Sequence, residues 1–432
     1  MTANTLLAIS YISRDAAIVL GNTLDLAKRV NRDFDSDFGV KSAQIGQNIN
    51  VRRPIRPTAN VGSIISAQAI TETYSPLTFT DPYNTSYVLT SSELTFSVED
   101  YYDKVVEPSV QQLASFIEAQ GQALLPQFYG LIGTPGTALT GGSSGTALPA
   151  INKALALLNK NDAPNQAGRK TLLNDPDFNA VLASSNLSYF NPGPEISKIY
   201  TSGYQGDYSA MRVFMNQLVQ SHTNGLYGGT PTIATTVPSN AVWGTSSTIS
   251  TTGWTATTTS LNYGDVFTIS GVYMVNPQTK QPLGTLQQFT VINGYPGLLN
   301  DGTYIVPPVN SMVTDGSGNS TITVSPAIVT TGGFQNVSQA PQAGATITVA
   351  GGSQVTTQNA LAFDRDAIML AAKELMPLSV GIGKTTTDDQ TRIPIRVQQA
   401  SDIKTNQEYM RFDVMVAWNV LYSQLGVRVA TT

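Results

Sequence analysis

The chain has 432 residues, of which 41% are hydrophobic and only 12% are charged. Globular domains usually carry about 25% charged residues, so Ser, Thr, Asn, Gln and Gly must supply most of the polar surface. The apolar fraction is sufficient for a buried core and excludes a disordered chain, and the length predicts two or three domains. A surface of low charge is typical of extensive protein–protein contact, because removing water from charges is costly.

The charge balance excludes further classes of protein. With 24 Lys and Arg against 29 Asp and Glu, the net charge is −5. This argues against tight nucleic-acid binding, since affinity for nucleic acids comes mostly from neutralised phosphates. The absence of Cys excludes disulfides and thiolate metal sites. The first residues lack the basic region of a secretory signal, and no apolar run is long enough for a transmembrane helix.

The N-terminal quarter contains helical and extended patterns. Apolar residues at helical spacing from Leu6 to Val30 predict one or two amphipathic helices ending near Asn31. The run IGQNINVRRPI at 45–55 predicts a strand, and the alternating residues 57–97 predict an extended hairpin.

A long helix is predicted next, with Pro108 in an early turn. Its apolar face comprises Val110, Leu113, Phe116, Ile117, Leu124 and Leu125. A Gly-, Thr- and Ser-rich loop at 131–148 follows, and helical patches are predicted at 149–160 and 207–220.

The composition changes sharply between Leu226 and Thr357. These 132 residues carry only four of the 53 charges in the chain. Strand-like runs separated by Gly- and Pro-bearing turns predict an all-β barrel or sandwich. The runs are VFTIS at 266–270, VYMV at 272–275, FTVI at 289–292, STITV at 320–324 and TITV at 346–349.

Beyond this segment the mixed pattern returns. Residues 360–375 (ALAFDRDAIMLAAKEL) predict a helix with Asp364 as its N-cap. Strands are predicted at 393–399, at 409–418 and near the C-terminus. Neither flank of the charge-poor segment has a self-sufficient core, so the sequence predicts one domain interrupted by another.

Three patterns invite a chemical interpretation, but each has a simpler one. Lys384 lies in VGIGKTTTDD, which resembles the end of a phosphate-binding loop, yet Leu378 occupies the position of the first Gly and a surface turn is favoured. His222 is the only His and no G-x-S-x-G motif is present, so a loop residue is favoured over a catalytic one. The acidic pairs Asp364/Asp366 and Asp388/Asp389 lack the spacing of a calcium loop and favour capping or solvated charge.

Two further groups are candidates for contacts. Arg52, Arg53 and Arg56 lie on one extended segment and could meet carboxylates of a neighbouring subunit, face DNA, or form a solvated strand edge. Trp243 and Trp254 could form a sugar-stacking face, but core packing is favoured. The sequence therefore predicts no catalytic, cofactor or metal site, and the chain is not expected to be an enzyme.

The order of these segments resembles the Hong Kong-type capsid fold of tailed bacteriophages, an α+β fold. The run at 45–55 looks like that family's strand before the E-loop, and VEPSVQQLASFIEAQGQALL at 106–125 looks like its spine helix. AFDRDAIMLAAKEL at 362–375 resembles a helix that follows the axial region. NYGDVFTISGVYMVNPQTKQPLGTLQQFTVI, followed by TDGSGNSTITVSPAIV, looks like the inserted β-barrel domain in the coat protein of short-tailed Salmonella-type phages.

The resemblance implies a domain plan for the whole chain. Its parts are an N-terminal arm at 1–47, a strand and E-loop hairpin at 48–97, a spine helix of the peripheral domain at 98–130, a peripheral and axial α/β region at 131–225, an inserted β domain at 226–357, and the completion of the axial and peripheral domains at 358–432.

The resemblance also implies a function. We expect a major capsid protein that self-assembles in the host cytoplasm into pentamers and hexamers of an icosahedral virion shell around double-stranded DNA. Expected partners are a scaffolding protein, a portal and, weakly, packaged DNA; no cofactor and no membrane are expected. Two alternatives from other classes are a surface adhesin with a carbohydrate-binding β module and an enzyme with a phosphate site at Lys384.

Overall fold

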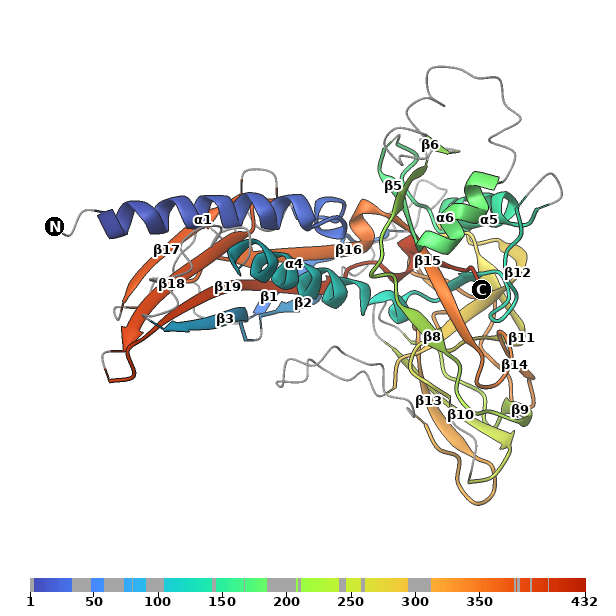
Figure 1. Ribbon diagram of the computed structural model, residues 1–432. Coiled ribbons are helices and arrows are strands. Elements are labelled where there is room, and N and C mark those ends of the chain that lie inside the picture. Colours follow the sequence, from blue (N-terminus) through green and yellow to red (C-terminus); the bar gives the residue numbers. More distant parts are fainter. Residues whose placement is uncertain are drawn as a thin grey trace, which may run out of the picture.

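The computed structural model describes residues 4–32, 48–57, 74–79, 81–90, 105–141, 145–166, 168–184, 207–208, 211–240, 246–257, 261–293, 312–376, 378, 381–388, 391–402 and 404–432. Within these ranges the chain has a mixed α+β structure whose strands form four sheets. Figure 1 shows one elongated lobe and, beyond one end of it, two further β-rich parts.

The elongated lobe is built on a five-stranded antiparallel sheet. Its strands are β16 (Ile368–Lys373), β19 (Gln407–Val420), β18 (Pro394–Asp402), β17 (Ile382–Thr387) and β3 (Tyr83–Thr90), which pairs with β19. Two helices, α1 (Asn4–Thr23) and α4 (Glu107–Gln122), pack on it, with α1 along β17 and β18 and α4 against β19 and β3 (Figure 1). The predicted helices in these two regions are confirmed. A short 3-10 turn, η1 (Leu26–Lys28), follows α1.

The amphipathic pattern explains why α4 forms and where it packs. Pro108 lies in the first turn, where its missing N–H has no partner to lose. Val110, Leu113 and Ile117 recur at helical spacing and are buried. Opposite them, Phe412 and Val414 of β19 belong to the same hydrophobic core. Helix and sheet therefore bury complementary apolar faces.

A buried ion-pair cluster lies between two strands of this sheet. The carboxylate of Asp413 is fully buried and binds Arg396 (Nη2 to Oδ2, 2.7 Å) and Arg411 (Nε to Oδ1, 2.6 Å). Arg396 also donates to the carbonyl of Met376 (2.7 Å), which lies in the connection from β16 to β17. The guanidinium of Arg396 thereby ties this connection to the strand pair β18–β19.

The second sheet contains seven strands and joins distant parts of the chain. In order they are β4 (Gly130–Ile132), β20 (Gly426–Ala430), β15 (Thr356–Asp364), β5 (Lys170–Asn174), β7 (Met211–Met215) and β6 (Asp207–Tyr208), with β8 (Ser221–Thr223) pairing with β15. The helix α5 (Ala147–Lys160) packs on β20, β15 and β4, and α6 (Pro176–Ser184) contacts α5. The predicted helix at 149–160 is confirmed by α5.

Two predicted helices are wrong. Residues 360–375 form β15, the 3-10 turn η5 (Arg365–Ala367) and β16, and residues 207–220 include β6 and β7. From Asn359 to Asp364 every residue of β15 is buried, because this strand lies inside its sheet. A continuous apolar run is the pattern of such a strand and does not distinguish it from a buried helix. In β7, Met211 and Val213 alternate with less buried residues, which is a strand period.

The charge-poor segment forms a six-stranded antiparallel sheet. Its order is β14 (Ile347–Val349), β11 (Val266–Val275), β12 (Pro282–Val291), β13 (Ser320–Ser325), β10 (Ser247–Trp254) and β9 (Gly229–Ile233), so the predicted strand runs are confirmed. A bridge between Thr232 of β9 and Thr346, next to β14, joins the two edge strands of the sheet. There Ile233 N donates to Ala345 O (2.9 Å). The sheet thus closes on itself around its own hydrophobic cluster.

A two-stranded hairpin base lies against the elongated lobe. Strand β1 (Asn48–Arg52) pairs with β2 (Tyr74–Thr78), and the connection between them includes residues 58–73, outside the described ranges. Val51 and Leu77 are buried against Met369 and Leu421. Of the hairpin predicted over 57–97, the described strands β2 and β3 pair with β1 and β19 and not with each other. Residues 58–73, 80 and 91–97 lie outside the described ranges.

The Asp413 cluster yields a stability prediction. Replacing Asp413 with Ala leaves Arg396 buried and without its carboxylate, which should lower the free energy of unfolding by about 3–5 kcal/mol. Urea denaturation measures this change. Glu408→Ala on the same strand is the matched control, because Glu408 forms no ion pair with any described residue. A loss of stability in Asp413→Ala no larger than in the control would contradict the prediction.

Candidate functional site

The three candidate arginines do not share one environment. Arg52 is exposed at the end of β1, directly opposite the exposed Tyr74 of β2. Arg53 turns inward: its Nη2 donates to the buried Ser75 Oγ (3.2 Å), and burial lowers the pKa of its guanidinium. The alternation of a strand explains this division, because neighbouring side chains point to opposite faces.

Arg56 contacts the charge-poor segment at Gly333, in the connection from β13 to β14. Its carbonyl lies so close to Gly333 that a Cβ at position 333 would overlap it. Lys280 Nζ donates to the carbonyl of the same Gly333 (2.5 Å), and the neighbouring charge of Arg56 contributes to lowering the pKa of Lys280, after burial. The structure therefore does not bring the three arginines together as one cluster, and Arg52 is the one that faces outward.

A second feature joins the N-terminal helix to α4. Glu118 of α4 is only 2% exposed, and its carboxylate accepts three backbone N–H groups of the turn after α1. These are Asp25 N (2.8 Å), Leu26 N (2.9 Å) and Ala27 N (3.2 Å). Burial raises the pKa of Glu118 to about 7, although the hydrogen bonds from Ala27 and Leu26 act in the opposite direction. Sequence periodicity alone could not identify Glu118, because it reads as an ordinary charged helix residue.

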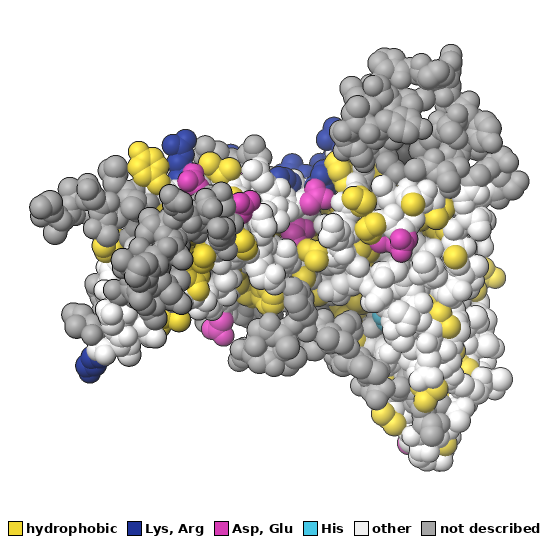
Figure 2. Space-filling view, viewed as in Figure 1, with side chains coloured by type: hydrophobic (Ala, Val, Ile, Leu, Met, Phe, Trp, Pro, Cys, Tyr) yellow, Lys and Arg dark blue, Asp and Glu magenta, His cyan; other side chains and the backbone are white. Residues whose placement is uncertain are grey.

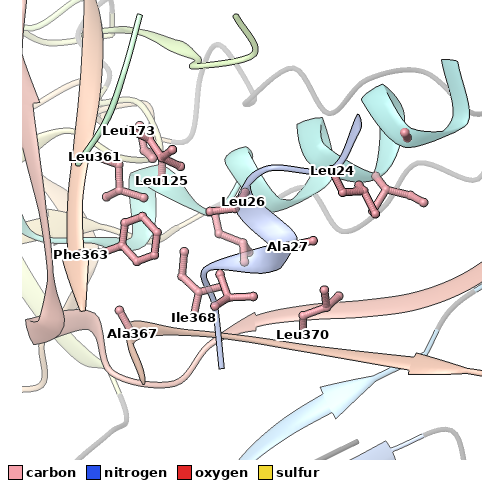
Figure 3. Packing of buried hydrophobic residues seen from close by; sticks show 14 of the residues in the cluster. Leu24, Leu26, Ala27, Leu125, Leu173, Leu361, Phe363, Ala367, Ile368 and Leu370 are labelled. Carbon is pink, nitrogen blue, oxygen red and sulfur yellow. The ribbon is translucent and has the colours of Figure 1, made fainter. Parts of the chain in front are cut away.

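The same turn fills the seam between two sheets. Figure 3 shows Leu26 pointing toward Phe363 and Ile368, which lie on either side of the crossover from β15 to β16. Asn31 continues this contact, since Leu370 N donates to Asn31 O (3.0 Å) and Asn31 Nδ2 donates to Asp366 Oδ1 (2.7 Å). The N-terminal segment is thus fixed at the point where the chain passes from one sheet to the other.

A buried polar cluster connects the charge-poor sheet to the rest of the chain. Asp265 is fully buried and accepts from His222 Nε2 (2.8 Å), Gly225 N (3.0 Å) and Asn262 N (2.9 Å). Arg428 of β20 is also buried; desolvation lowers the pKa of its guanidinium to about 10, and the charge of Asp265 opposes this shift. His222 is therefore a buried strand residue and not the loop residue predicted from the sequence.

The remaining chemical candidates have structural roles. Lys384 lies within β17 and neither in a turn nor before a helix, so the phosphate-loop and surface-turn interpretations are both wrong. Asp388 Oδ2 accepts from Thr391 N (2.7 Å) in the connection from β17 to β18, where no helix is capped by it, and Asp389 lies outside the described ranges. Asp364 caps η5 and pairs with Arg169 (3.1 Å).

The structure also bears on the sugar-stacking interpretation of the Trp residues, on membrane-spanning helices and on metal sites. Trp254 is 5% exposed, and its Nε1 donates to Thr251 Oγ1 (2.8 Å) inside the core of the charge-poor sheet. Core packing is therefore confirmed for Trp254, and Trp243 lies outside the described ranges. Among the described residues, no helix is long and apolar enough to span a membrane, and no group of His, Asp and Glu could hold a metal ion.

The molecular surface differs between the parts. Figure 2 shows almost no Lys, Arg, Asp or Glu on the visible face of the β-rich part at the lower right, where the charge-poor strands lie, and clusters of charge on the elongated lobe. Exposed large apolar residues include Tyr74 (62%), Met376 (83%) and Leu378 (63%).

The sequence comparison identifies which family of structural proteins this is. The profile of the family described as "P22 coat protein - gene protein 5" matches residues 22–430. The chain belongs to this family. It is a bacteriophage major capsid protein, a subunit of an icosahedral shell, and the adhesin alternative has no support. Comparison with curated proteins found no match.

The solved structures that match this chain include phage chains and a virus-like particle. A chain from Mycobacterium phage Che8 matches with a TM-score of 0.46 and 10% identity, covering 94% of this chain and 90% of that one. A chain from the capsid of Cyanophage P-SCSP1u matches with a TM-score of 0.44 and 11% identity, covering 89% and 84%. A virus-like particle from Pyrococcus furiosus matches with a TM-score of 0.38 and 6% identity, covering 98% and 99%.

The Glu118 contact yields a pH prediction. The pKa of Glu118 is raised from 4.5 to about 7, so the folded chain holds this proton more tightly than the unfolded chain. Its contribution to stability is complete below about pH 4.5 and is lost as the pH rises through 7. The free-energy difference between wild type and Glu118→Gln should change by roughly 3 kcal/mol across that window.

Urea denaturation of both proteins at a series of pH values measures this difference. Glu107→Gln, at the start of the same helix, is the control, since among the described residues Glu107 accepts only from the Gln111 side chain, at the surface. Parallel stability curves for wild type and Glu118→Gln between pH 4.5 and 7.5 would contradict the prediction.

Proposed function

We propose that the chain forms the pentamers and hexamers of a phage head enclosing double-stranded DNA, with the domain plan of the Hong Kong-type capsid fold. In this assignment α4 is the spine helix, α1 belongs to the N-terminal arm, and β1 and β2 are the base of the E-loop. The elongated lobe corresponds to the peripheral domain and the seven-stranded sheet to the axial domain. The observation that carries this assignment is the long helix lying along a long antiparallel sheet (Figure 1).

The outward face of the hairpin base is the proposed contact surface. Its inner face is occupied, because Val51 and Leu77 pack on the elongated lobe. Its outer face presents the cross-strand pair Arg52 and Tyr74, and Ile55 beyond β1 is 42% exposed. Arg and Tyr are enriched among the residues that dominate protein–protein binding energy. We assign Arg52 to contact with a carboxylate of a neighbouring subunit, while Arg53 and Arg56 support the segment from within.

Reversing the charge of Arg52 should impair assembly without unfolding the subunit. Arg52 is exposed, so Arg52→Glu should lower the melting temperature of the subunit only slightly, while repulsion lowers the assembly rate about tenfold or more. Negative-stain microscopy and sedimentation of lysates measure the fraction of the chain in closed particles. Lys153→Glu makes the same charge change on the exposed side of α5. Equal particle yields for both variants would remove Arg52 from the proposed contact.

We further propose that residues 226–357 are an inserted domain with a bracing role. The chain enters it after β8 and returns in β15, and these two strands pair at the point of entry, with His222 opposite Thr357. The segment encloses its own hydrophobic cluster. It contacts the remainder through Gln288, which exchanges two hydrogen bonds with the backbone of Leu131 (2.9 and 2.8 Å), and through Asp265.

Deleting residues 226–357 and joining the ends should destabilise the remaining chain. The deletion removes Asp265 from the buried Arg428 and His222 and exposes Leu131. We expect a loss of about 3–5 kcal/mol. Calorimetry of the unassembled subunit and microscopy of particles test this. Normal particles together with an unchanged subunit stability would rule out the bracing role.

The remaining proposed partners are those expected for a phage coat protein during and after assembly. We propose assembly in the host cytoplasm with a scaffolding protein and a portal, followed by residence in the virion. A net charge of −5 favours only weak, sequence-independent contact with packaged DNA. Catalysis has no part in this proposal, since the buried carboxylates Asp265, Asp364 and Asp413 have partners within the fold.

A further inference from the structure

A polar cleft lies where three parts of the molecule meet. It has a volume of about 320 Å³, and its walls come from the hairpin base, from the end of β19 with the turn after it, and from the charge-poor sheet. Arg53 and Ser75 represent the first part, Asn419 and Ser423 the second, and Ser325 the third. This volume lies at the lower end of the range for small-molecule sites, about 300–1,000 Å³.

The cleft carries a positive charge. Among the described lining residues, Arg53 is the one whose side chain is charged at neutral pH. Its guanidinium is held in place by the hydrogen bond to Ser75 Oγ (3.2 Å). No carboxylate lines the described walls, so the lining itself does not suit a cation. A fixed guanidinium in a partly desolvated cleft favours an oxyanion, because its N–H groups match carboxylate and phosphate geometry.

Neutral hydrogen-bonding groups complete the lining. Five half-buried side chains make no hydrogen bond to another described residue, so their donors and acceptors are open to a ligand or to water. These side chains are Gln127, Ser246, Ser325, Ser423 and Gln424. An apolar site would not present such groups, and each hydroxyl or amide can both donate and accept. The combination suits a ligand that carries hydroxyl groups beside its anionic group.

We propose that this cleft binds a small hydroxylated oxyanion of the size of glycerol phosphate. Its anionic group pairs with the guanidinium of Arg53, and its hydroxyls bind the serine and glutamine side chains on the opposite walls. A bound ligand then links the hairpin base, the end of β19 and the charge-poor sheet in one hydrogen-bonded network. This site is independent of the subunit contacts proposed above, because binding requires only a single folded chain.

Isothermal titration of the purified full-length chain tests the site. The probes are glycerol 3-phosphate, inorganic phosphate and glycerol at constant ionic strength. We expect saturable binding of one glycerol 3-phosphate per chain, weaker binding of inorganic phosphate and none of glycerol. Arg53→Gln should raise the Kd for glycerol 3-phosphate at least about tenfold, as expected when a charge-assisted hydrogen bond is lost.

Two variants separate binding from folding. Lys153→Gln removes one positive charge from the exposed side of α5 and should bind as wild type does. The double variant Ser325→Ala/Ser423→Ala removes two hydroxyls that have no partner among the described residues, so it should keep the wild-type melting temperature and bind more weakly. Absence of saturable binding to wild type would overturn the proposal. So would equal affinity in the double variant, or equal affinity for inorganic phosphate and glycerol 3-phosphate.

Discussion

The arrangement of the elongated lobe depends on how the turn after α1 is held. Glu118 accepts three successive backbone N–H groups at the start of the 3-10 turn η1, which would otherwise be buried without acceptors. Leu26 is thereby fixed in the seam between two sheets (Figure 3). Gly121 makes this approach possible, since a Cβ there would lie 2.8 Å from the Leu26 side chain. One carboxylate and one missing side chain therefore fix the turn that follows the N-terminal helix.

The sequence predicted best those features that one segment determines by itself. The helix α4 follows from Val110, Leu113 and Ile117 on one face, and the strands of the charge-poor segment follow from short β-branched runs between Gly-bearing turns. The segment 360–375 could not be predicted in this way, because its buried residues face neighbours on both sides of a sheet that forms from distant parts of the chain. Asp364 was correctly predicted as a cap, but it caps a 3-10 turn between two strands.

The candidate site residues show the same limit: the sequence identified the segment but not the long-range contacts of its side chains. The sequence identified a basic extended segment at 52–56, but it could not show that Arg53 turns toward Ser75 while Arg52 faces solvent. That division depends on the register of β1 with β2 and on the apolar surface under the hairpin, which Met369 and Leu421 provide from far along the chain. The prediction for His222 failed for the same reason: its partner Asp265 is 43 residues away, directly before strand β11 of another sheet.

The few described charges of residues 226–357 have partners within the chain and do not lie free on its surface. Asp265 is buried at the junction, Lys280 binds the carbonyl of Gly333, and Asp315 accepts N–H groups of its own turn from Ser317 and Asn319. Each of these charges is thus engaged within the chain. The visible face of this part otherwise shows uncharged side chains, with scattered hydrophobic ones among them (Figure 2). Such a surface loses less hydration energy on contact than a charged one, because desolvating an amide or hydroxyl costs far less than desolvating an ion. In a shell subunit, this allows the charge-poor part to lie beside neighbouring chains without requiring matched charges on them.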